Sequence, residues 1–164
     1  MDPVHFTGRE ILEMALRIEE NGVKFYTGAG RASKNRNVSG VFKDLAREEE
    51  LHIKIFTELG RLVPEGASND AYAPYMEEAS DYLKALADSE VFTRPLEGAK
   101  LAGKIRGEKE AIDYAIQMEK DSLLFYLEMR GMIRERDRAV IENLIEQEKG
   151  HLSKLTALKK EFFG

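Results

Sequence analysis

Two Glu-x-x-His pairs, Glu49 with His52 and Glu148 with His151, have the residue types and the spacing of metal ligands. On an α-helix, residues three apart project from the same face, about one turn from each other. Each pair can therefore present one carboxylate oxygen and one imidazole nitrogen to a single metal ion. A lone pair of this kind arises easily by chance in a chain rich in glutamate. Two pairs, each inside an apolar helical stripe, indicate a metal site.

An internal repeat connects these pairs to two more glutamates. The segments 15–26 and 115–126 share Ala, Glu, Phe and Tyr at a constant offset of 100 residues (119 − 19), and the Glu-x-x-His pairs recur at an offset of 99 (148 − 49). Two helix pairs thus repeat, each supplying one Glu and then a Glu with a His. A two-fold arrangement of the halves is expected to bring six ligands together: Glu19, Glu49, His52, Glu119, Glu148 and His151.

Neighbouring residues offer alternatives to this ligand set. Glu20 and Glu48 each stand one position before or after a predicted ligand, but they fall beside the apolar stripes, and we expect both to be solvated. Tyr26 and Tyr126 lie within the stripes and within the repeat. They are either core aromatics or residues that support the site from behind the ligands, for example by a hydrogen bond to a carboxylate.

Amphipathic helices must position these side chains. Apolar residues at helical spacing predict four of them, near residues 8–28, 38–62, 107–134 and 138–160. Capping signals mark their ends: a capping box at Thr7-Gly8-Arg9-Glu10, a glycine-rich end at Gly28-Ala29-Gly30, and an N-cap at Asp137.

Between the second and third helices runs a connection of ~40 residues that is punctuated by Pro and by glycines such as Gly98, and an amphipathic pattern predicts a short helix near 75–87 within it. A connection this long can return along the bundle. The sequence therefore predicts an all-α four-helix bundle with one long crossover.

Four glutamates at core-facing positions are hard to explain without a metal. Burying an unpaired carboxylate costs several kcal/mol, and the four stripes contain no Lys or Arg. Two divalent cations would carry +4 against −4 on the four carboxylates, and two neutral imidazoles complete the set. Oxygen and nitrogen ligands without thiolate suit iron, manganese or zinc.

Composition limits the other functions. The chain has 164 residues, 34% of them charged and 43% hydrophobic, which is typical of one soluble domain. A net charge of −5 gives no reason to expect a nucleic-acid partner, and the absence of Cys excludes disulfides and Cys-ligated metal within this chain. The first nine residues lack an apolar signal-peptide core and no apolar run is long enough to span a bilayer, so we expect a cytoplasmic protein with no membrane partner.

With these residues in this order, the chain resembles the rubrerythrin branch of the ferritin-like di-iron carboxylate superfamily. The match rests on the six predicted ligands, and the stretch from about 60 to 106 matches only as a crossover. The resemblance implies a single ferritin-like domain over residues 1–164 with two iron ions, manganese or zinc being alternatives. Two features depart from the family pattern. Ser122 stands where rubrerythrins usually carry a further Glu, and the Cys-rich rubredoxin domain is missing.

The resemblance also implies a function, the reduction of hydrogen peroxide or oxygen at a non-haem di-iron site. Without a rubredoxin domain, the electrons must come from an external donor. In this interpretation Glu49 and Glu148 bridge the metals, Glu19 and Glu119 are terminal ligands, and each histidine binds one metal. Iron storage or delivery through a ferroxidase site is the alternative, and a metal-free helical interaction module is a third hypothesis. A homodimer is expected on family grounds alone.

Overall fold

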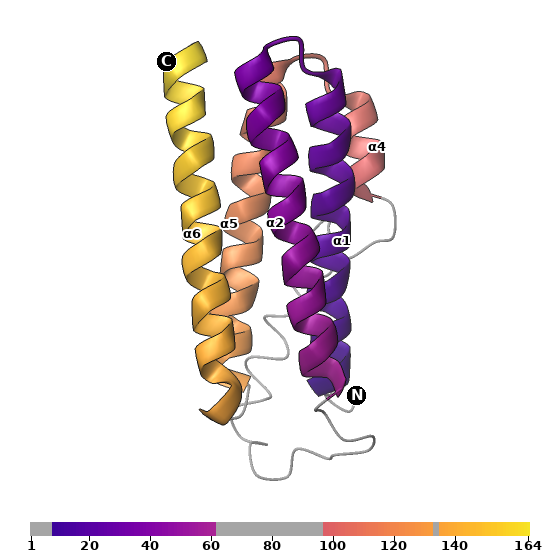
Figure 1. The fold of residues 1–164 in the computed structure, drawn as a ribbon, viewed down its shortest axis with the longest axis vertical. Helices are drawn as coiled ribbons and strands as arrows, with labels where there is room; N and C mark the ends of the chain where they lie inside the picture. The colour runs from indigo at the N-terminus through magenta and orange to yellow at the C-terminus, as the bar shows by residue number, and fades with distance from the viewer. Residues whose placement is uncertain (1–7, 62–96, 133–134) are drawn as a thin grey trace, which may run out of the picture.

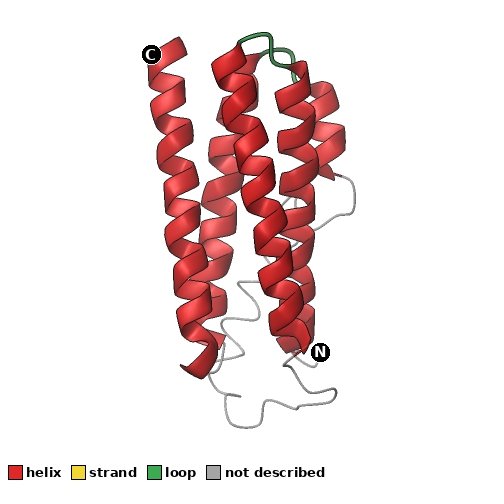
Figure 2. Ribbon diagram, viewed as in Figure 1, coloured by secondary structure: helices red, strands yellow, loops and turns green. Residues whose placement is uncertain are grey.

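The structure, a computed structural model, describes residues 8–61, 97–132 and 135–164. Within these ranges the chain forms helices and no strand (Figure 2). The helices are α1 (Gly8–Ala32), α2 (Arg36–Arg61), α4 (Glu97–Lys104), α5 (Glu108–Met132) and α6 (Glu135–Phe163). The all-α prediction is confirmed. None of these helices combines the length and the apolar character needed to cross a membrane.

The four long helices α1, α2, α5 and α6 lie side by side along one axis, and α4 lies on the outer side of α1 (Figure 1). α1 and α2 are antiparallel neighbours, as are α5 and α6. α2 and α5 begin at the same end of the bundle, so the chain must cross the length of the bundle between them (Figure 1). This is the predicted one-crossover topology.

The predicted apolar stripes form the core of this bundle. Almost every stripe residue is buried, and only Val23 and Ser122 are half-buried. Aromatic side chains fill much of the interior: the rings of Tyr26 and Phe42 stack with centroids 6.0 Å apart, and those of Phe56 and Tyr126 lie 5.3 Å apart. Fully burying one such apolar side chain stabilises the fold by about 1.5–3 kcal/mol. The core therefore holds the tyrosines firmly in place.

The predicted end of the first helix at Gly28-Ala29-Gly30 is wrong, because α1 continues to Ala32. Gly28 does not end the helix, but its small size allows α4 to pack closely against α1. A Cβ added at Gly28 would lie 2.6 Å from the Cβ of Ala102 on α4, closer than carbon atoms approach without a shift. The missing side chain therefore lets α4 lie directly against α1.

Gly98 was expected to punctuate a loop, but it lies in α4. Its N–H faces the side-chain oxygen Oδ1 of Asn21 at 3.4 Å, and an added Cβ would overlap the backbone carbonyl of Asn21. Two glycines thus fit α4 against α1 at two points. The short helix predicted near 75–87 and the capping residue Thr7 lie outside the described residues.

Two predicted helix starts are also corrected. α2 begins at Arg36, because Asn35 caps it: Asn35 Oδ1 accepts hydrogen bonds from the backbone N–H of Asn37 at 2.8 Å and of Val38 at 3.4 Å. α6 begins at Glu135, so Asp137 lies inside the helix and is not its N-cap. Glu135 is the first residue of α6, and its negative charge suits the positive N-terminal end of the helix dipole.

Candidate metal centre

The predicted ligands meet in the middle of the four long helices. α1 and α5 each supply one glutamate, and α2 and α6 each supply a glutamate and a histidine, which gives Glu19, Glu119, Glu49 with His52, and Glu148 with His151. All six side chains are buried, with residue exposures between 0% and 4%. The helical period explains this placement, since each ligand occupies a core-facing position of its helix.

The six side chains form two overlapping groups. In each group the candidate ligand atoms lie within 4.8 Å of one another: Glu19, Glu49, His52 and Glu148 in the first, and Glu49, Glu119, Glu148 and His151 in the second. Glu49 and Glu148 belong to both groups. Each group has the composition of a four-ligand site, three carboxylates and one imidazole.

The shared carboxylates direct one oxygen to each histidine. His52 Nδ1 lies 2.9 Å from Glu49 Oε2 and 2.9 Å from Glu148 Oε1. His151 Nδ1 lies 3.4 Å from Glu49 Oε1 and 3.3 Å from Glu148 Oε2. The two imidazole rings stack with centroids 5.5 Å apart and planes inclined by 17°. This is the geometry in which two carboxylates can bridge two adjacent metal positions.

The remaining two glutamates close the outer sides of this arrangement. Glu19 Oε2 lies 3.5 Å from His52 Nδ1, and Glu119 Oε2 lies 3.5 Å from His151 Nδ1. Each belongs to one group only. Glu19 therefore lies on the His52 side of the cluster, and Glu119 on the His151 side.

Several buried polar atoms of the cluster lack a hydrogen-bond partner among the described residues, as expected of a metal site without its metal. His151 Nε2, on the outer side of its ring, is buried without a hydrogen-bond partner within the described part of the chain. The same holds for four atoms at the centre, Glu49 Oε2, His52 Nδ1, Glu148 Oε1 and His151 Nδ1. These atoms converge on one another without forming hydrogen bonds, and a buried polar atom left unsatisfied costs about 1–3 kcal/mol. Metal ions placed between them would satisfy all of these atoms, so the donor set fits a metal centre.

The electrostatics of the site divide its carboxylates into two kinds. Burial, and then the neighbouring carboxylates, raise the pKa of Glu19 and of Glu119 well above their usual range. Burial acts in the same direction on Glu49 and Glu148, but other contacts outweigh it and lower both pKa values. At Glu49 these are contacts with Glu19 and then with the two histidines, and at Glu148 they are contacts with the two histidines. Without metal, the outer glutamates therefore hold their protons to a higher pH than ordinary glutamates, and the shared ones lose theirs at a lower pH.

The histidines carry the opposite charge. Burial alone would lower the pKa of His52 and His151, but the surrounding carboxylates reverse the effect and raise the pKa of each well above its usual value. Two imidazolium ions then balance two carboxylates. This opposite charge offsets part of the cost of burying four acids together.

Tyrosines support the outer glutamates from the opposite helix. The Tyr26 hydroxyl on α1 donates a hydrogen bond to Glu119 Oε1 on α5, and the Tyr126 hydroxyl on α5 donates one to Glu19 Oε1 on α1. Burial, together with the nearby carboxylates, raises the pKa of both phenols well above its usual value. Both tyrosines therefore remain protonated donors.

The rubrerythrin family model matches residues 10–159, nearly the whole chain. The chain belongs to the rubrerythrin family. Membership in this family and the buried Glu/His cluster together fit a di-iron site.

Two solved structures are similar to this chain in fold. The crystal structure of a putative ferritin-like diiron-carboxylate protein from Thermotoga maritima is similar to this chain. The two sequences are 26% identical, and the structures have a TM-score of 0.66 over 96% of this chain and 97% of that chain. A hypothetical protein from Pyrococcus furiosus is 19% identical, with a TM-score of 0.56 over 94% of this chain and 89% of that one, and shows the shared fold alone. The comparison with curated proteins gives no match.

The solvated position predicted for Glu48 in this rubrerythrin is wrong. Its side chain is 34% exposed, and Glu48 Oε2 lies 2.6 Å from His151 Nε2, on the side of the ring away from the other ligands. Gln147 occupies the corresponding place on the other histidine, with its Oε1 3.2 Å from His52 Nε2. Glu20, in contrast, is exposed as predicted.

The repeat contained the signal for these two residues. Positions 48 and 147 are separated by the same 99 residues as the Glu-x-x-His pairs (147 − 48), each directly before a shared glutamate. The burial pattern of one helix does not reveal them, because their contacts are made to the facing helix.

Proposed function

We propose that this rubrerythrin is a non-haem di-iron oxidoreductase that reduces hydrogen peroxide or oxygen with electrons from an external donor. The observation that carries the proposal is the position of Glu49 and Glu148, whose two oxygens each face one of the two histidines. Carboxylates placed in this way can hold two metal ions close together. Adjacent metal ions suit a two-electron reduction of a small oxidant.

Two bound Fe(II) ions would supply the two electrons that convert hydrogen peroxide and two protons into two water molecules. The protein's own contribution is to hold and shield them. Glu49 and Glu148 would bridge the metal positions, Glu19 and Glu119 would close them as terminal ligands, and each histidine would serve one position through Nδ1. Because all of these side chains are buried, bulk water is excluded from the site.

A small cavity beside the cluster supports a small oxidant. It measures about 10 Å³, and its lining includes Glu19, Gly22, Glu119 and Ser122. That volume is close to the minimum that admits one water molecule. Gly22 keeps the space open, since an added Cβ would lie 3.3 Å from Glu49 Cγ. A site of this size favours peroxide or oxygen over a bulky organic substrate.

The tyrosines have a defined place in this proposal. Tyr26 and Tyr126 fix the orientation of Glu119 and Glu19 through their hydrogen bonds. As protonated phenols close to the site, they also can intercept stray one-electron oxidation before it spreads through the core.

The test is anaerobic loading with Fe(II) followed by stopped-flow absorption after one equivalent of hydrogen peroxide or oxygen. The wild-type protein is expected to bind two irons per chain and to oxidise them rapidly, whereas Glu49→Ala should lose both properties. Glu50→Ala is the matched control, because Glu50 is exposed and adjacent in sequence. An unreactive wild-type protein that holds two irons would refute the oxidoreductase proposal and leave the metal site standing.

Iron storage or delivery is the alternative function of the same residues. It differs in that iron passes through the site instead of staying there. Repeated additions of Fe(II) with oxygen distinguish the two. Retention of clearly more than two irons per chain would favour iron handling, and a constant two irons with continued turnover of peroxide would favour the oxidoreductase.

A further inference from the structure

The two halves of the repeat differ where they support the histidines. Behind His151 stands a carboxylate, Glu48 Oε2, at 2.6 Å from Nε2. Behind His52 stands an amide, Gln147 Oε1, at 3.2 Å from Nε2. The ligands themselves are the same on both sides, three carboxylates and one imidazole. The two sides therefore differ in the residues behind the ligands, a carboxylate on one side and a neutral amide on the other.

We infer that Glu48 and Gln147 make the two metal positions unequal, so that the position served by His151 binds a divalent ion more tightly and fills first. The inference rests on the metal site proposed above and concerns how its two halves differ. Glu48 is a positioning residue, because it acts on the metal through His151.

Glu48 and Gln147 are each held by a further side chain. The two residues therefore differ in charge, and not in how well their side chains are ordered. Lys154 Nζ lies 2.8 Å and 3.0 Å from the two carboxylate oxygens of Glu48. The Nε2 amide of Gln147 donates a hydrogen bond to Asn143 Oδ1 at 2.5 Å. The repeat places Ile55 where the other half has Lys154 (154 − 99), so the charged support exists on one side only.

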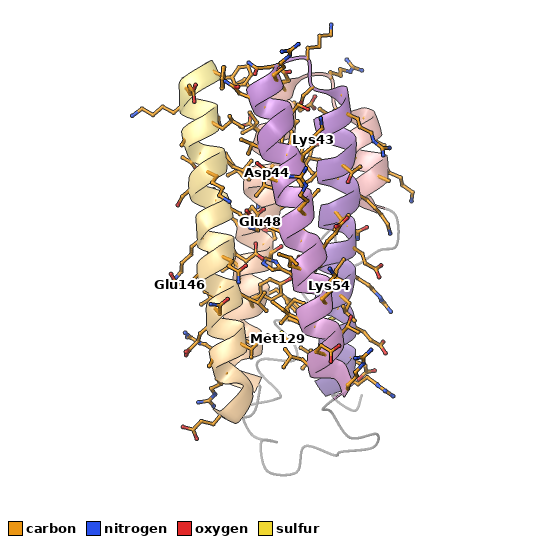
Figure 3. The ribbon with its side chains drawn as sticks, viewed as in Figure 1. Lys43, Asp44, Glu48, Lys54, Met129 and Glu146 are labelled. Atoms are coloured by element: carbon orange, nitrogen blue, oxygen red, sulfur yellow. The ribbon has the colours of Figure 1, made fainter. Side chains whose placement is uncertain are left out.

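Figure 3 shows Glu48 on the side of α2 that faces α6, the helix that carries His151 and Lys154. Glu48 thus joins the two helices at the level of the metal centre. Lys154 is 49% exposed and Glu48 is 34% exposed, so the chain His151–Glu48–Lys154 runs from a buried ring to the surface.

Both supports fix the same tautomer but with different strength. A carboxylate and an amide oxygen are acceptors, so each favours a proton on Nε2 and leaves Nδ1 free to bind metal, although the contact of Glu48 with His151 Nε2 is an ion pair without hydrogen-bond geometry. A carboxylate stabilises the positive charge that the ring gains when it binds a cation, and it makes the imidazole a stronger donor. A neutral amide does this less. Removing such a support typically lowers metal affinity by about 10–100-fold.

The repeat supplies a matched set of variants: Glu48→Gln, Gln147→Glu, and the double exchange. The probe is Zn(II), titrated into protein labelled with ¹⁵N-histidine and followed by NMR and calorimetry. The chain contains only three histidines, so the ring signals of His52 and His151 are readily assigned. Glu50→Gln is the control, since it removes the same charge from an exposed position on α2.

In the wild-type protein the first equivalent of Zn(II) should shift the His151 signals, and the second those of His52, with affinities about 10–100-fold apart. Glu48→Gln should weaken the first event until the two overlap. Gln147→Glu should strengthen the second event, and the double exchange should make His52 bind first. Glu50→Gln should behave as wild type. A purely structural role for Glu48 would weaken both events together and would not reverse their order.

Simultaneous shifts of both histidines in the wild-type protein, or an unchanged order in the double exchange, would overturn this inference. In either case two bound Zn(II) ions would leave the metal site of the proposed function intact. A protein that binds no Zn(II) and no Fe(II) would overturn both.

Discussion

The phenol of Tyr26 on α1 donates a hydrogen bond to Glu119 on α5, and the repeat of this contact runs the other way, from Tyr126 to Glu19. Each tyrosine therefore supports the outer glutamate of the other half of the molecule. The two helices that supply only one ligand each are joined to one another through the site. This cross-connection makes the integrity of the metal centre depend on both halves at once.

Replacing Tyr26 by Phe tests this contact. Phenylalanine fills the same space, but Glu119 then keeps a buried oxygen without its donor, which costs about 1–3 kcal/mol. We expect Tyr26→Phe to lower the free energy of unfolding of the metal-free protein by that amount in urea denaturation. Tyr114→Phe is the control, because Tyr114 is 41% exposed and lies on α5, the helix that carries Glu119. Equal stabilities of the two variants would show that the contact contributes nothing.

Metal binding should stabilise the wild-type protein and not Glu49→Ala. An ion that binds only the native state adds about 2.7 kcal/mol at a concentration 100 times its dissociation constant. Glu49 belongs to both ligand groups, so its removal weakens both positions. Thermal unfolding with and without Fe(II) under anaerobic conditions measures the effect. Glu50→Ala should keep the full increase in Tm, and an equal increase in Glu49→Ala would show that Glu49 is not a ligand.

Metal binding should also release protons. The raised pKa values favour a proton on each of Glu19 and Glu119 and an extra proton on each of His52 and His151. Metal ions require all four groups deprotonated at the coordinating atom, so two divalent ions displace the protons that these groups hold, up to four in number. Affinity must therefore rise as pH rises and fall as pH falls.

Calorimetry in buffers of different ionisation enthalpy counts these protons. We expect about four per two ions at pH 7. Glu19→Gln should release one fewer, and Glu20→Gln, at an exposed position, should match the wild type. Metal binding without proton release would contradict the proposed protonation state of the cluster.

The sequence predicted which glutamates and histidines are buried together, and the reason is physical. Whether a side chain faces the core depends on its place in the 3.6-residue period of its own helix, and this pattern separated buried Glu19 from exposed Glu20. The repeat then indicated which stripes belong together. The helical period is a property of one helix, and the repeat is a property of two segments of the chain. Both can therefore be read from one sequence without knowledge of the fold.

Contacts between helices were not predictable in the same way. Glu48 lies beside the apolar stripe of α2, and only the approach of α6 brings it to His151, 103 residues away (151 − 48). Gly28 and Gly98 carry typical helix-breaking signals, but the close packing of α4 on α1 uses their small size. Local propensity gives way to tertiary packing at these positions.

Gly28 provides a test of this packing that is independent of the metal. An alanine normally stabilises a helix interior relative to glycine by about 0.5–1 kcal/mol. At Gly28 the new Cβ would lie 2.6 Å from the Cβ of Ala102, so α4 must move away from α1. Such overpacking typically costs about 1–3 kcal/mol. We therefore expect Gly28→Ala to destabilise the protein despite its better helix propensity.

Gly40 in α2 is the matched control, because an added Cβ there meets nothing within 4 Å. Gly40→Ala should raise the free energy of unfolding by about 0.5–1 kcal/mol, and urea denaturation of the two metal-free variants compares them directly. The double variant Gly28→Ala with Ala102→Gly removes the clashing methyl group and should recover much of the lost stability. If Gly28→Ala alone stabilised the protein as Gly40→Ala does, the contact between α1 and α4 would not be as close as the structure has it.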